Sequence, residues 1–250
     1  MELRNNIIKL VLAFVAFSSF AFMEAQDIVI LEEEKASQYI PPEEEAKKLT
    51  FFQGFSLSVD LFPLGQKLLT DFGGAEASLK LNLYNTFFPT FELGFSSCDH
   101  TDGNTKIQYK TNAPYLRAGV DFNLLKNKFQ DNKLFVGARY GFSNYNFDIS
   151  GPEITDPYWG GASPFSYTDI NTTSHWFEIV AGAQVKIFKH FHMGWIVRFK
   201  REINSTKNDY AQPYYIPGYG TTSNSTTWGA SYNLTFDLNW GKKGKEVPQY

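Results

Sequence analysis

Residues 75–84 read AEASLKLNLY, with apolar side chains at every odd position and polar ones at every even position up to Asn82. Successive side chains of a β-strand point to opposite faces, so a period of two is typical of a strand whose faces meet different surroundings. An amphipathic helix would instead place apolar residues three and four positions apart. This stretch therefore predicts a strand with one apolar and one polar face.

The same alternation recurs along the chain after Phe51. Eight segments carry it: 57–61, 75–84, 91–95, 116–124, 134–143, 177–187, 193–200 and 232–240. Short connections follow the second, fourth and sixth segments. Longer ones follow the others, and the last two are expected to be loops from Ile149 to Thr173 and from Asn204 to Thr226. An even number of strands with short turns at one end and long loops at the other predicts an all-β fold, an eight-stranded antiparallel up-and-down transmembrane β-barrel over residues 51–240.

The period alone leaves the direction of the two faces open, because a soluble lipocalin-like barrel has the same alternation with its apolar face inside. Bulky side chains on the apolar parity are too numerous for the narrow interior of eight strands. Glycines on the polar parity would leave room there for long charged neighbours. They are Gly54, Gly94, Gly119, Gly137, Gly141, Gly182 and Gly194. We therefore expect the polar parity inside and the apolar parity in lipid.

On this assignment, six acidic and six basic side chains point into the lumen. They are Asp60, Glu76, Glu92, Asp121, Glu178 and Asp237, with Lys80, Arg117, Arg139, Lys186, Arg198 and Lys200. Charges in a confined interior must be paired or neutralised, so the balance favours an interlocked structural plug. A selective pore or a proton relay is the alternative.

The N-terminus has the layout of a secretory signal peptide. Arg4 and Lys9 precede an apolar run over 10–22, and Ala25 offers a small residue for cleavage. An uncleaved anchor is the competing interpretation, but the run is short for a membrane span. Residues 1–25 are thus predicted to be a signal peptide, and the apolar run is not followed by a cysteine that could carry a lipid.

Residues 26–50 form a predicted acidic, flexible periplasmic leader, with seven acidic and three basic side chains over 26–49. A partner-binding peptide is the alternative for this segment. Residues 241–250 are predicted to be a polar C-terminal tail. The rest of the chain, 50–250, has 17 acidic and 18 basic residues and hence no basic footprint for nucleic acid.

Candidate catalytic groups are sparse. His100, beside Asp99 and Asp102, and His175 are expected near the outer rim, whereas His190 and His192 are expected at a short periplasmic turn. A rim hydrolase that uses His100 or His175 is one possible interpretation, and a divalent-metal site at His100 with Asp99 and Asp102 is another. The groups are scattered over loops, so we expect no enzyme, metal or cofactor. The single cysteine, Cys98, excludes a disulfide within one chain.

The long loops are rich in aromatic residues, in a chain that is 17% aromatic. Tyrosine and tryptophan suit contact with an extracellular protein or glycan. The candidates are Tyr158, Trp159, Phe165, Tyr167, Tyr214, Tyr215 and Tyr219. The alternative is that these side chains cap the barrel or join the aromatic belt at the membrane interface.

Several motifs occur in an order that resembles a family of uncharacterised outer-membrane β-barrel proteins from Bacteroidota. They are Gly137-Ala138-Arg139-Tyr140-Gly141-Phe142, Trp176-Phe177-Glu178, Val197-Arg198-Phe199-Lys200-Arg201, Tyr215-Ile216-Pro217-Gly218 and Tyr232-Asn233-Leu234-Thr235-Phe236. The resemblance implies an outer-membrane barrel and no established activity. The closing strand, which ends at Trp240, also resembles the signal read by barrel-insertion machinery, although here a polar tail follows it.

Together these patterns predict a monomer in the bacterial outer membrane, in contact with its lipid and assembled by the insertion machinery. Its expected role is structural, or surface contact through the extracellular loops. A narrow pore for small solutes or ions is the first alternative, and a hydrolase at the rim is the second.

Overall fold

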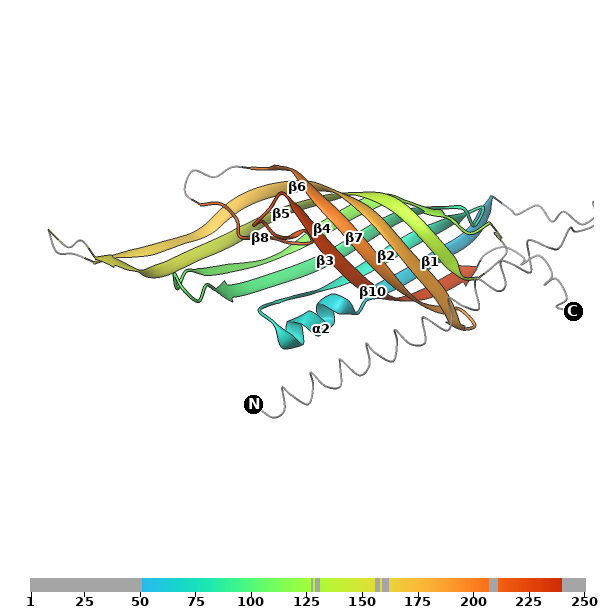
Figure 1. Cartoon of the computed structure of the whole chain (residues 1–250), viewed down its shortest axis with the longest axis horizontal. Helices are drawn as coiled ribbons and strands as arrows, with labels where there is room; N and C mark the ends of the chain where they lie inside the picture. The colour runs from blue at the N-terminus through green and yellow to red at the C-terminus, as the bar shows by residue number, and fades with distance from the viewer. Residues whose placement is uncertain are drawn as a thin grey trace, which may run out of the picture.

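The computed structural model describes residues 51–239 apart from 127, 129–130, 156–157, 159–161 and 207–210. Eight antiparallel strands close into a barrel in the order β1-β10-β7-β6-β5-β4-β3-β2 (Figure 1). Their bounds are β1 (Phe52–Asp60), β2 (Phe72–Leu83), β3 (Phe87–Thr101), β4 (Gln108–Asn123), β5 (Lys133–Thr155), β6 (Ala162–Phe188), β7 (Phe191–Ser205) and β10 (Thr226–Asn239). All eight predicted strands are therefore present. The predicted signal peptide, leader and C-terminal tail lie outside the described residues.

The first and last strands close the ring. Ser58 on β1 pairs with Thr235 on β10, and their side-chain oxygens are 2.8 Å apart. Because every strand has a partner on each side within the barrel, its wall has no open sheet edge. Within the described part of the chain, no helix is long and apolar enough to cross a membrane.

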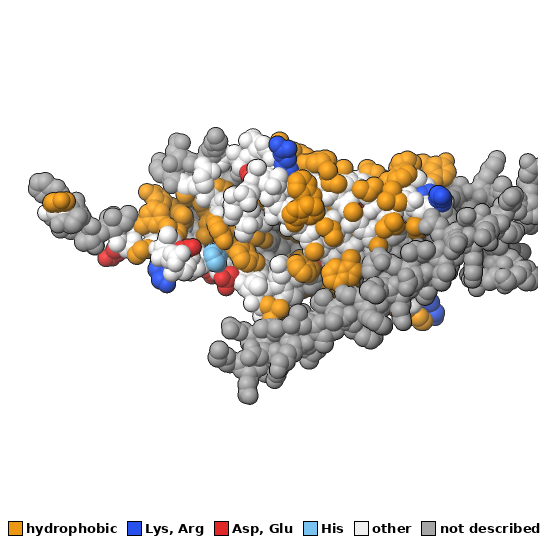
Figure 2. Space-filling model, viewed as in Figure 1, with side chains coloured by type: hydrophobic (Ala, Val, Ile, Leu, Met, Phe, Trp, Pro, Cys, Tyr) orange, Lys and Arg blue, Asp and Glu red, His pale blue; other side chains and the backbone are white. Residues whose placement is uncertain are grey.

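The two faces of the wall differ as the alternation predicts. Leu93 and Val120 are 58% and 47% exposed on the outside, whereas their chain neighbours Glu92 and Asp121 are only 2% and 1% exposed. In Figure 2, hydrophobic side chains spread over the barrel wall. In this part of the wall, the apolar side chains are thus outside and the polar side chains inside.

The predicted loop from Ile149 to Thr173 is wrong. Strands β5 and β6 continue through most of it, and their hairpin projects beyond the rest of the barrel (Figure 1). Strand β4 pairs with β5 only as far as Ser150, so the β5–β6 hairpin continues alone beyond that residue. The alternation was missed there because the outward side chains become polar, although backbone pairing goes on.

Two further elements lie where only loops were expected. The helix α2 (Phe62–Leu69) follows β1, and Pro63 occupies its first turn, where a missing N–H costs nothing. A small hairpin joins β8 (Tyr215–Ile216) to β9 (Gly220–Thr221). Its turn includes Gly218 with a φ of +81°, a conformation that favours glycine.

Candidate functional site

Three arginines and their carboxylate partners fill the middle of the barrel. Arg117 on β4 contacts Glu76, Glu92 at 2.8 Å and Glu178 at 3.1 Å. Arg198 on β7 contacts the same three carboxylates, at 3.2, 2.9 and 3.2 Å. Each glutamate therefore contacts at least two guanidinium groups, which lets the network satisfy several lone pairs at once.

A third arginine extends this network toward the short-turn end. Arg139 donates to Glu92 at 2.7 Å and to both oxygens of Asp121, at 2.6 and 3.0 Å. Lys80 also donates to Asp121, at 3.0 Å. Such bidentate geometry fixes the two planar groups relative to each other. The layer is therefore a multiply bonded network of charges across the lumen.

The interior glycines make room for large neighbours, and at Gly94 and Gly141 these are aromatic side chains instead of the charged ones that were expected. A Cβ at Gly141 would overlap the indole ring of Trp176, and one at Gly94 would overlap the ring of Tyr115. Those two side chains in turn hold the carboxylates. Trp176 donates from Nε1 to Glu178 at 2.7 Å, and Tyr115 donates from its hydroxyl to Glu76 at 2.6 Å.

Eleven of the twelve predicted lumen charges are buried in the structure. Lys186 is the exception, because its side chain is 31% exposed and pairs with Asp131 at 2.6 Å at the short-turn end of the barrel. Seven of the eleven are joined by the arginine contacts, namely Glu76, Glu92, Asp121, Glu178, Arg117, Arg139 and Arg198. Asp60 lies apart and accepts from the backbone N–H groups of Phe62 and Tyr232, at 2.9 and 3.0 Å.

Two interior groups escaped the sequence analysis. Lys133 is buried and donates to Asp237 at 3.2 Å, and His192 is 3.5 Å from the same carboxylate. The expectation that His192 belongs to a short periplasmic turn is wrong, since it lies on β7 with its side chain inside the barrel and is 3% exposed. Both residues lie on the inner parity of their strands. Lys133 is two residues before the inward Phe135, and His192 is two residues before the inward Gly194. Extending the alternation backward by two residues in each strand would therefore have placed both side chains inside.

An apolar layer covers the charges on the long-loop side. It includes Tyr145, Phe147 and Trp176 from the barrel wall and Ile216 and Tyr219 from the β8–β9 hairpin. Lys200 fastens the hairpin by donating to the carbonyl oxygens of Gly218 at 2.7 Å and Tyr219 at 3.0 Å. The loop between β7 and β10 is thus folded inward over the lumen.

This packing places some of the seven aromatic loop candidates inside the barrel and leaves others exposed. Tyr219 is 1% exposed, so its predicted role in surface contact is wrong, and it caps the barrel instead. Tyr215 also faces inward and bonds with Ser96 at 2.6 Å. Phe165 is half-buried against Tyr167. Exposed candidates are Tyr158, Tyr167 and Tyr214. Trp159 lies outside the described residues.

The rim histidines do not meet the groups considered for catalysis. His100 bonds with Asp71 at 3.2 Å and stacks on Tyr214, while His175 bonds with Tyr140 at 2.7 Å. Asp102 accepts hydrogen bonds within its own turn from Thr105 and Asn104, which lower the pKa of its carboxyl group. In the part of the chain that the structure describes, no cluster of three or more ligating side chains could hold a metal ion.

The polarity of the wall inverts along the barrel axis. On β5, the outward residues change from Tyr140 and Phe142 to Asn144 and Asn146, while the inward ones change from Arg139 to Tyr145 and Phe147. The outward amides form a ladder with β6, in which Asn171 donates to Asn146 at 2.7 Å. Strand β4 repeats the change, from outward Leu116 to Asn112 and Lys110. The projecting end is therefore built like a water-soluble β-protein, and the rest is built the opposite way.

Residues 4–243 match a family model described as a domain of unknown function, DUF6048. The chain belongs to this family. The match spans the whole barrel of this DUF6048 member, and the family description names no activity that could assign roles to the interior charges. No curated protein matches the chain.

Proposed function

We propose that this protein crosses the bacterial outer membrane as a closed barrel and acts at the cell surface through its projecting end. The inversion of polarity along the wall is the observation that carries the proposal. Outward apolar residues around inward charges suit hydrocarbon, whereas outward amides around inward aromatics suit water. A soluble barrel would have polar outward residues along its whole length.

The height of the apolar band agrees with a membrane. On β3, the outward residues are apolar over the nine positions from Phe87 to Phe95 and become polar from Ser97. Nine strand residues extend about 30 Å. At the usual barrel tilt of about 40°, they cover about 23 Å, close to the apolar band of about 25 Å in outer-membrane barrels. The charged interior then lies at membrane depth, where closure satisfies every backbone group.

The filled interior favours a structural or surface-contact role over transport. Arginine and carboxylate groups bridge the lumen from opposite strands, and the β8–β9 hairpin covers them. The β5–β6 hairpin extends furthest from the proposed membrane and has Tyr158, 91% exposed, near its tip. We propose an extracellular protein or glycan as the partner of this end, because exposed tyrosines suit both classes.

The inversion of polarity and the resemblance to outer-membrane barrels of Bacteroidota both support the proposed location. A secretory signal at residues 1–25 would deliver the chain to the periplasm of a Bacteroidota cell, and β10 would present the alternating segment to the insertion machinery. The outward side chains would then contact outer-membrane lipid in a monomeric barrel.

Location and orientation can be tested together with single-cysteine variants. A membrane-impermeant maleimide should label Tyr158→Cys on intact cells, whereas Lys126→Cys at a short turn should react only after the outer membrane is permeabilised. Cys98 is 1% exposed and serves as an unreactive background. Unboiled protein from the outer-membrane fraction should also migrate differently from boiled protein. Recovery as a soluble periplasmic protein, or equal labelling of both variants on intact cells, would refute the proposal.

Two alternatives have distinct tests. A narrow pore would give reproducible single-channel steps in planar bilayers, which the bridged interior leads us not to expect. A rim hydrolase would lose turnover in a His100→Ala, His175→Ala double variant. Neither histidine lies near a serine and a carboxylate together among the contacts described above, so the geometry favours the non-enzymatic role.

A further inference from the structure

The helix α2 exposes apolar side chains on the face that it turns away from the barrel. Leu64 and Leu68 are 43% and 70% exposed, and Phe62 at the start of the helix is 40% exposed. Residues four apart lie on the same side of a helix, so Leu64 and Leu68 are neighbours. Between them Lys67 is also exposed. The helix therefore presents two leucines outward, and the exposed Lys67 lies at the edge of this face with the base of its side chain close to Gly73 of the wall.

The opposite face of α2 is held against the barrel wall. Strand β1 ends at Asp60, while its neighbours continue further, β10 to Thr226 and β2 to Phe72. Asp60 accepts from the N–H of Phe62 and fixes the start of the helix. At the other end, the stem of Lys67 lies so close to Gly73 that a Cβ there would overlap it. These contacts set both the position and the direction of α2.

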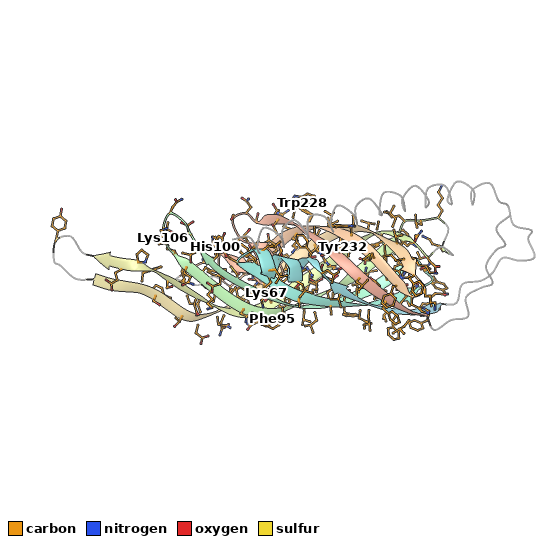
Figure 3. The ribbon with its side chains drawn as sticks, turned by 90° about the horizontal axis from the view of Figure 1, so that it is seen from below. Lys67, Phe95, His100, Lys106, Trp228 and Tyr232 are labelled. Carbon is orange, nitrogen blue, oxygen red and sulfur yellow. The ribbon has the colours of Figure 1, made fainter. Side chains whose placement is uncertain are left out.

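The helix lies at the edge of the apolar band that faces the long loops. Gly73, which Lys67 touches, pairs with Ser97, two residues beyond Phe95, the last outward apolar residue of β3. In Figure 3, Lys67 and Phe95 occupy nearly the same position along the long axis, and His100 and Lys106 lie further toward the projecting end. Trp228 is 71% exposed on β10 near this level, as is common for tryptophan at a membrane interface.

We propose that α2 is a membrane-interface helix whose Leu64 and Leu68 enter the outer leaflet at the boundary between acyl chains and headgroups. Lys67 would extend its ammonium group to the headgroup phosphates while its stem stays in the apolar layer. The inference rests on the proposed membrane location and adds a lipid-binding surface outside the strands. Its position favours lipid over a protein partner, because α2 meets the wall at Gly73, whose partner Ser97 is only two residues beyond Phe95 at the end of the apolar band.

Spin labels can test the helix and the barrel separately. Cysteine would replace Leu68, Leu93 or Lys110, one at a time in a Cys98→Ala background, with unboiled gel mobility as the check on folding. Leu93 is inside the band, one outward position before its end at Phe95, and the Lys110 side chain, 61% exposed, is beyond it. The labelled proteins would be placed in vesicles of phosphatidylethanolamine and phosphatidylglycerol. Oxygen, which concentrates in lipid, and a water-soluble nickel chelate would then compete to relax each label.

We expect oxygen to dominate at positions 68 and 93 and the nickel chelate to dominate at 110. Nickel dominating at 68 while oxygen still dominates at 93 would overturn the interface helix and leave the transmembrane barrel standing. Low access of both reagents to position 68 would indicate a protein contact and would also overturn the lipid assignment. Nickel dominating at both 68 and 93 would refute the membrane location itself.

Discussion

Arg198 on β7 and Glu92 on β3 meet inside the barrel, with 2.9 Å between Nη1 and Oε2. These strands are diametrically opposite in the closed order of eight. A single ion pair therefore bridges the whole width of the lumen. The bridge is direct evidence of a filled interior, and it makes the network a sensitive place for substitutions.

Glu92 should be essential to barrel stability. Its carboxylate contacts Arg117, Arg139 and Arg198, so Glu92→Gln would leave three buried guanidinium groups short of negative charge. Breaking a buried ion pair in this way costs about 3–5 kcal/mol. Urea unfolding in vesicles would measure the loss. Asp99→Asn, at a rim carboxylate whose side chain is 51% exposed, should change the unfolding free energy by less than about 0.5 kcal/mol. If Glu92→Gln changed the unfolding free energy as little as Asp99→Asn, the charge network would contribute little to stability.

The membrane assignment predicts different costs for one substitution at two sites on the same face of β4. Val120 is in the apolar band, and Asn112 is beyond its edge. Val120→Arg should lower the free energy of unfolding in vesicles by about 2–4 kcal/mol, because the charge enters hydrocarbon, and Asn112→Arg by about 0–1 kcal/mol. Similar losses at both positions would contradict a lipid boundary between them.

Gly141 should not tolerate a side chain. A Cβ at this position would overlap the Trp176 ring, which is itself fixed by its bond to Glu178. Overpacking of this kind costs about 1–3 kcal/mol. We expect Gly141→Ala to lose that much unfolding free energy, measured in urea. Gly103→Ala, in a turn with open space around it, is the matched control and should leave stability nearly unchanged.

Lys200 should hold the β8–β9 hairpin closed. In Lys200→Met, the two hydrogen bonds to the carbonyl groups of Gly218 and Tyr219 are lost while most of the stem volume is kept. Hydrogen exchange of the amides over 215–221 should become faster, with the strands around the charged layer unchanged. Lys110→Met, on the outer surface, provides the comparison. Unchanged exchange in the hairpin would show that aromatic packing alone holds it.

Strand number and the identity of the two faces could be read from the sequence because both follow from covalent geometry. A strand places alternate residues on opposite sides, so AEASLKLNLY at 75–84 already separates Glu76 and Lys80 from Leu79 and Leu81. The same reasoning placed eleven of the twelve lumen charges. It missed Lys133 and His192, because the alternation continues by one more residue before the expected strand starts at Leu134 and Met193.

The tertiary structure alone decided which side chains pair across the lumen and how far each segment lies along the barrel axis. Glu92 and Arg198 are 106 positions apart, and only the strand register brings them together. The β5–β6 projection was hidden because outward polar residues ended the apolar period while hydrogen bonding continued. The inward fold of Tyr219 depends on Trp176 and Lys200, which belong to distant strands. The sequence by itself thus determined which side of the wall each residue faces, because that property is local, whereas contacts across the lumen depend on closure of the ring.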